Sequence, residues 1–66
     1  MKDLYVTKGK SKNNKIYYAL IAECETVYGI QRIPLTFDWR KIRPLLPNLT
    51  DVDLVSAPVG TTWGVI

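Results

Sequence analysis

The residue types that could do chemistry in this chain are basic and aromatic, and they gather in its first half. Four lysines fall between positions 8 and 15 without an intervening acid, and two adjacent tyrosines, Tyr17 and Tyr18, follow after one residue. Lysine ammonium groups bind phosphates, and exposed aromatic rings stack on unpaired bases. The pattern therefore predicts a surface for single-stranded nucleic acid. The residues that we expect to carry it are Lys8, Lys10, Lys12, Lys15, Tyr17 and Arg32.

The distribution of charge supports a local basic surface. The net charge is +3, and the four lysines of the segment supply +4, so the remainder of the chain sums to 3 − 4 = −1. Gly9, Ser11, Asn13 and Asn14 lie between those lysines, and glycine, serine and asparagine are typical of exposed turns. Lysines are also common in exposed turns for solubility alone. A solubilising hairpin loop is therefore the competing interpretation.

Residues for catalysis or metal binding are few. The chain has no histidine, the commonest general base and metal ligand, and its single cysteine cannot complete a CxxC zinc site. Two acidic pairs, Glu23 with Glu25 and Asp51 with Asp53, are spaced as exposed edge or turn residues. Cys24 lies between two acids, which disfavour its thiolate, so we expect it to pack in the interior. The sequence predicts a protein that is not an enzyme, with no catalytic residue, no metal site and no cofactor.

The length and composition limit the architecture. With 66 residues, 47% of them hydrophobic, the chain has room for one small domain spanning residues 1–66. Such a domain has a thin core, so a homodimer is a further expectation. No apolar run approaches the roughly 18 residues of a membrane span, and the N-terminus lacks the pattern of a signal peptide. A lone cysteine fits a reducing compartment. We therefore expect a cytoplasmic protein without membrane contact.

The hydrophobic pattern predicts three strands and then a short helix. Residues 4–7, 16–25 and 30–37 alternate as strands, with Tyr18 on the core face of the second. Pro34 places the third strand at an edge or a bulge, because proline cannot donate to a strand ladder. Asp38 is a suitable helix N-cap, and Pro44 ends regular helix near Arg43.

Two further short strands are predicted at residues 52–57 and 61–65. The resulting order is β-β-β-α-β-β, a β-rich α+β class. It fits either a small OB- or SH3-like barrel or a five-stranded sheet with one short helix after the third strand.

The central segments resemble a known family. The run Lys12-Asn13-Asn14-Lys15-Ile16-Tyr17-Tyr18, then Tyr28-Gly29 and Ile33-Pro34-Leu35-Thr36-Phe37-Asp38, is similar to the central hairpins of the small single-stranded-DNA-binding proteins of filamentous phages and related mobile elements. The resemblance covers less than half of the chain. It implies a phage or mobile-element origin and a dimeric OB-like barrel. It also implies backbone and base contacts at Lys12, Lys15, Tyr17 and Arg32.

Two other interpretations remain open from the sequence. A small intracellular inhibitor or adaptor that binds a host or defence protein would need no catalytic residue, and an exposed strand edge would serve as its docking surface. A homo-oligomeric structural accessory protein would need an apolar patch, which Leu45, Leu46, Leu49 and Ile66 could supply.

Overall fold

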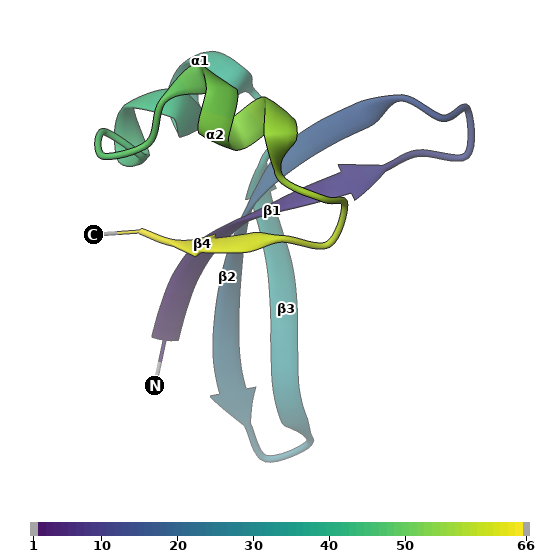
Figure 1. Ribbon diagram of the computed structural model, residues 1–66. Coiled ribbons are helices and arrows are strands. Elements are labelled where there is room, and N and C mark those ends of the chain that lie inside the picture. Colours follow the sequence, from purple (N-terminus) through teal and green to yellow (C-terminus); the bar gives the residue numbers. More distant parts are fainter. Residues whose placement is uncertain (1, 66) are drawn as a thin grey trace.

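The frame of the molecule is a four-stranded antiparallel sheet with a helical layer on one side (Figure 1). The computed structural model describes residues 2–65. The strands are β1 (Lys2–Lys10), β2 (Ile16–Thr26), β3 (Gly29–Thr36) and β4 (Thr62–Gly64), in the order β3-β2-β1-β4. The protein is β-rich, as predicted. The sheet is open, however, and the described residues form four strands instead of a closed barrel or a five-stranded sheet.

The first hairpin is longer than the sequence pattern predicted. β1 begins before residue 4 and continues to Lys10, so the first two lysines of the basic segment belong to a strand and not to the loop. Val6 lies opposite Leu20, and Lys8 lies opposite Tyr18. Side chains alternate across a strand, so these four share the face that the helices cover.

The third strand lies at an edge of the sheet and carries a bulge, and both features were predicted from Pro34. The register against β2 shifts between Leu20 and Ile21, whose partners are Thr36 and Pro34, so Leu35 is the additional residue. Proline is tolerated there because an edge or a bulge does not require its missing N–H.

The first helical segment begins where the sequence predicted. α1 spans Trp39–Ile42, and the carboxylate of Asp38 accepts a hydrogen bond from the Arg40 N–H at 3.0 Å. The chain then tightens into a 3-10 turn, η1 (Arg43–Leu45), which contains Pro44. The predicted N-cap and the predicted end near Arg43 are both confirmed.

The segment predicted as a strand at residues 52–57 is instead a helix, α2 (Asp51–Ser56). A reciprocal pair of hydrogen bonds starts it: the Asp53 N–H donates to Thr50 Oγ1 at 3.1 Å, and the Thr50 N–H donates to Asp53 Oδ2 at 3.0 Å. This capping box satisfies two N–H groups that the first turn leaves free. The Thr50 backbone and hydroxyl bonds hold the pKa of Asp53 below its ordinary value.

Arg43 closes the connection between the two helical segments. Its Nη1 and Nη2 atoms donate to the carbonyls of Leu46 and Leu49, at 2.7 and 2.6 Å. Its Nε lies 3.1 Å from an oxygen of Asp51, the first residue of α2. The guanidinium group therefore fixes a loop that has few backbone hydrogen bonds of its own.

The core lies between the middle of the sheet and the helical layer. Its buried residues come from β1, α1, the loop after η1 and α2, and partly buried side chains of β2 and β4 pack against them. The central cluster of buried residues is Val6, Ile42, Leu46 and Leu54, and Ala19 and Ala22 of β2 are also buried. Such a core is thin, so the polar contacts around it matter for stability.

Lys8 is a buried part of this assembly and not an exposed loop residue. Its side chain is 5% exposed, and its Nζ donates to three backbone carbonyls at the end of α2. The acceptors are Leu54 at 3.0 Å, Val55 at 2.8 Å and Ala57 at 2.8 Å. An ammonium group has three donors, and here all three are used. Its predicted role in contacting a ligand is therefore replaced by a structural one.

Replacing Lys8 with Met should lower the free energy of unfolding by about 2 to 3 kcal/mol, because carbonyls at the end of α2 lose a charged donor. Lys10→Met is the matched control, since Lys10 is exposed, lies on the same strand and face, and makes no side-chain hydrogen bond within residues 2–65. It should change stability by less than about 0.5 kcal/mol. Urea unfolding followed by circular dichroism measures both, and equal effects would contradict the role assigned to Lys8.

Candidate functional site

The predicted site residues separate into three groups in the structure. Lys10, Lys12, Lys15 and Tyr17 are exposed and lie together at the end of the β1–β2 hairpin. Lys8 is buried beneath α2. Arg32 lies on β3 opposite Glu23. Tyr17 and Glu23 are six residues apart on one strand, so Arg32 is about 20 Å from the lysine turn.

The turn that carries the lysines is closed by its own hydrogen bonds. The Asn14 N–H donates to the Ser11 carbonyl at 3.0 Å, and the Ser11 N–H donates to the Lys15 carbonyl at 2.9 Å. The Ser11 hydroxyl also accepts from the Lys15 N–H at 3.2 Å. Asn14 has φ 62°, the left-handed conformation that asparagine tolerates well. Lys12 and Lys15 therefore extend from a defined turn.

Tyr17 covers the backbone of the opposite strand. It pairs with Gly9 across the hairpin, and a Cβ placed on Gly9 would collide with the Tyr17 ring. The glycine thus allows the ring to lie close against β1. Tyr17 remains 40% exposed. One side of the ring rests on the strand while the rest meets solvent.

Phe37 adds a second exposed ring beside Tyr17. The ring centroids are 5.9 Å apart with an interplanar angle of 67°, an edge-to-face pair, and Phe37 is 60% exposed. Such pairs are stabilised by the aromatic quadrupoles. We call Lys10, Lys12, Lys15, Tyr17 and Phe37 the basic hairpin surface.

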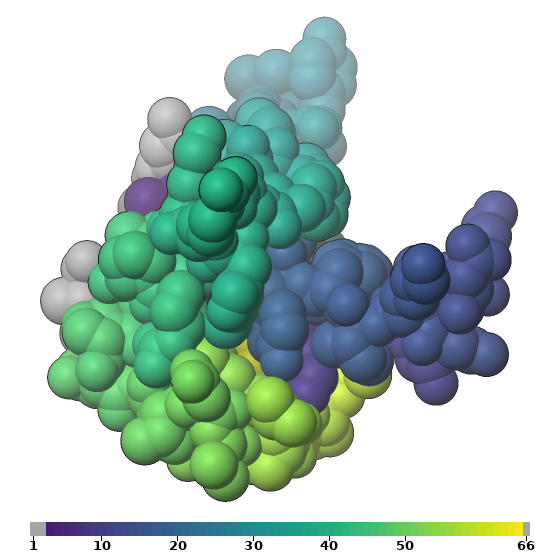
Figure 2. Space-filling view, turned by 90° about the horizontal axis from the view of Figure 1, so that it is seen from above, coloured from purple at the N-terminus to yellow at the C-terminus, as the bar shows by residue number. Residues whose placement is uncertain are grey.

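The charges of the basic hairpin surface are not neutralised by neighbours. The ion pairs among residues 2–65 involve arginines, and none includes Lys10, Lys12 or Lys15. The space-filling view shows this hairpin, in dark blue and purple, projecting from the body (Figure 2). Three exposed ammonium groups therefore lie at the end of the projecting hairpin, and the exposed rings of Tyr17 and Phe37 lie at the same end of the sheet.

Arg32 lies in a different environment. Its Nε is 3.4 Å from a carboxylate oxygen of Glu23, so its charge is partly compensated. Both residues line a shallow hollow on the sheet face opposite the helices, together with Tyr5, Thr7, Ile21 and Thr62. The acids of β2 lie at this end of the sheet, which weakens the attraction of Arg32 for an anion.

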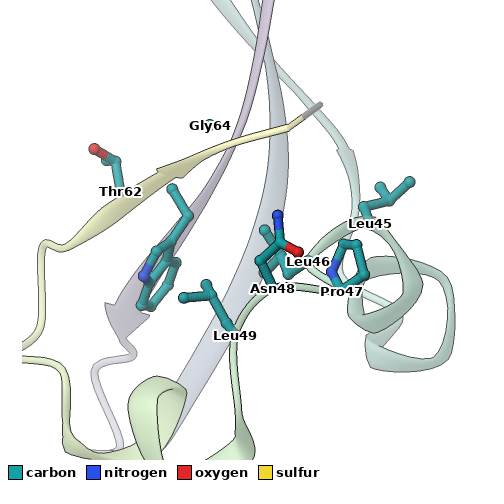
Figure 3. A pocket seen from close by; sticks show the side chains of 8 residues that line it. Leu45, Leu46, Pro47, Asn48, Leu49, Thr62 and Gly64 are labelled. Carbon is teal, nitrogen blue, oxygen red and sulfur yellow. The ribbon is translucent and has the colours of Figure 1, made fainter.

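A separate apolar pocket lies between the helical layer and β4. Its volume is about 350 Å³, at the lower end of the range for small-molecule sites. Leu45, Leu46, Pro47, Asn48 and Leu49 form one side, and residues 62–64 of β4 form the other (Figure 3). No charged side chain lines it. It could accept an apolar group, but it has no feature that selects an anion.

The binding residues predicted from the sequence omitted Phe37 and wrongly counted Lys8 as exposed. Both errors have the same cause. Each position depends on a segment far away in the chain: Phe37 reaches Tyr17 through the bulged end of β3, and α2 covers Lys8 from residues 51–56. The exposed positions of Lys12 and Lys15 depend only on a local turn, and that turn was predicted from its composition.

Comparisons with protein-family models, curated proteins and solved structures find no match. Neither helix of residues 2–65 is long and apolar enough to cross a membrane. Within the same residues, no three acidic or thiol side chains gather as a metal site. The geometry of this chain is therefore the only basis for assigning it a function.

Gly9→Ala should move the Tyr17 ring off β1 at little cost in stability, because the atoms that must shift are the far end of a half-exposed side chain. The free energy of unfolding should fall by less than about 1 kcal/mol. Nuclear Overhauser contacts between the Tyr17 and Phe37 rings should weaken. Unchanged contacts between the rings would show that Gly9 does not control the position of Tyr17.

Proposed function

We propose that this protein binds single-stranded nucleic acid through the basic hairpin surface. The observation that carries the proposal is the exposed Tyr17–Phe37 pair at the same end of the sheet as three exposed lysines, which have no ion-pair partner within residues 2–65. Tyr17 lies on the sheet face opposite Lys10, so Lys12 and Lys15 of the turn are the lysines that a strand stacked on the rings would meet first. Lysines on a protruding turn attract the phosphate backbone, and rings next to them stack on bases. The ligand chemistry of both parts is that of a nucleic acid strand.

A single strand suits this surface better than a duplex. In a duplex the faces of the bases are stacked on one another, so exposed aromatic rings have little to bind. The helices of residues 2–65 have four and six residues and pack over the core, so neither is suited to enter a major groove. The rings of Tyr17 and Phe37 gain most from unstacked bases.

The small number of lysines predicts modest affinity with limited salt dependence. Each phosphate neutralised on a single strand contributes about −0.7 to the slope of log K against log salt concentration. Three lysines therefore give a slope of about −2. Lys8 is excluded from this count because it is buried, and Arg32 lies outside the surface. Base stacking must supply the remainder of the affinity.

Replacing Lys12 and Lys15 together with Ala should weaken binding to labelled oligo(dT) by roughly ten- to thirty-fold at about 0.1 M salt and reduce the salt slope by about 1.4. Arg40→Ala with Lys41→Ala is the control, since it removes the same charge from exposed positions of α1. Fluorescence anisotropy measures both. Equal losses would mean that net charge, and not this turn, attracts the strand, and no binding of the wild-type protein at low salt would overturn the proposal.

Tyr17→Ala should weaken binding through lost stacking, by about 1 to 3 kcal/mol, while the salt slope stays the same. Tyr28→Ala is a suitable comparison, because Tyr28 is 91% exposed at the tip of the other hairpin, away from the lysines. The same anisotropy titration at several salt concentrations separates the two effects. Tyr17 would have no role as a stacking platform if both variants bound like the wild-type protein.

A further inference from the structure

The chain exposes more surface than a compact monomer of its mass. Its accessible surface is 5020 Å², whereas a folded monomer of 7.5 kDa is expected to expose about 4,250 Å². Its radius of gyration is 12.5 Å, against about 10.8 Å for a compact domain of 66 residues. The excess area is about 770 Å². The fold is therefore extended in a way that leaves surface without a covering layer.

Much of the exposed apolar surface lies on the β2–β3 hairpin, on its turn and on β3. This hairpin projects away from the helical layer, with β3 along its outer edge (Figure 1). No residue of β3 is buried. Of the thirteen large hydrophobic residues that are exposed among residues 3–65, five fall between positions 27 and 35: Val27, Tyr28, Ile30, Ile33 and Leu35. This short segment therefore carries a large share of the exposed apolar side chains.

We propose that a second copy of this chain covers the β2–β3 hairpin, with the two β3 strands adjacent and antiparallel across a two-fold axis. A standard protein interface buries about 800 Å² on each partner, and the whole chain, with its two projecting hairpins, has an excess surface of about 770 Å². A two-fold axis presents the same patch from both copies, so a single self-complementary strand edge is sufficient.

The composition of β3 favours self-pairing. Free sheet edges are usually protected by lysines, and β3 has none. Its one charged residue, Arg32, is paired with Glu23 of the same chain. Two β3 strands that approach each other therefore do not bring two unpaired positive charges close together. Pro34 and the bulge at Leu35 interrupt the second half of the edge, which leaves the segment 29–33 for pairing.

The position of the hairpin favours the same arrangement. β2 has eleven residues, so its two ends are about 33 Å apart, and the lysine turn lies at the opposite end from the β2–β3 turn. Copies joined at the β2–β3 end keep their basic hairpin surfaces apart. The proposal stands on area and edge geometry, so it is independent of the proposed nucleic-acid binding.

Sedimentation velocity without nucleic acid, at about 0.5 M salt to screen surface charge, tests the proposal. Interfaces of standard size hold at micromolar concentrations or below, so the wild-type protein should sediment as a dimer at about 100 μM. Ile30→Lys should shift it to monomer, because it replaces an apolar side chain of the pairing segment 29–33 with a charged one that the interface would have to desolvate. The variant should fold, since position 30 is 60% exposed.

Val55→Lys is the matched control, because Val55 is 73% exposed on α2, the change in charge is the same and the residue replaced is also an exposed β-branched one. It should remain a dimer, and circular dichroism should show that both variants are folded. A wild-type monomer at about 100 μM would overturn the proposal, since interfaces of this size associate at lower concentration. Equal weakening by Ile30→Lys and Val55→Lys would overturn it too.

Discussion

The buried ammonium group of Lys8 links the sheet to the helical layer, and the rest of the fold depends on this link. The last carbonyls of a helix have no partner within the helix, and burying them without donors is costly. Lys8 supplies donors to three of them from the adjacent strand β1. Removing the Lys8 ammonium group would leave buried carbonyls without donors, and removing the end of α2 would leave a buried cation without acceptors. The lysine and the helix end therefore stabilise each other.

Tyr18 completes the same contact from the neighbouring strand. It lies opposite Lys8, its hydroxyl donates to the Leu54 carbonyl at 3.1 Å, and its ring centroid is 5.8 Å from Lys8 Nζ. Its ring also lies 4.4 Å from Trp39 and 6.2 Å from Trp63, centroid to centroid. One register pair of the hairpin thus contacts α1, α2 and β4, and it places the helices over the middle of the sheet. Both ends of β2 are left uncovered.

The parts of this structure that were predictable from the sequence depend on local chemistry. The Asp38 cap, the end of helix near Pro44 and the edge position of β3 each follow from one residue and its immediate neighbours. The prediction of a strand at residues 52–57 was wrong: Val52 and Leu54 are two apart, the spacing of one strand face, whereas the Thr50–Asp53 capping box starts a helix there. The burial of Lys8 was not predictable from its neighbours in sequence, since α2, which covers it, lies more than forty residues further along the chain.

A run of lysines in a sequence need not form a charged surface in the fold, because distant segments can cover some of them. Lys8 and Lys10 lie on one face of one strand, and they differ only in whether α2 reaches them. The helical layer stops between the two positions, so three lysines of the run are exposed and not four. Because the far end of β2 is about 33 Å away, several Debye lengths at physiological salt, these charges have little effect there. A nucleic acid proposed for the basic end and a second copy proposed for the apolar end would therefore not interact electrostatically.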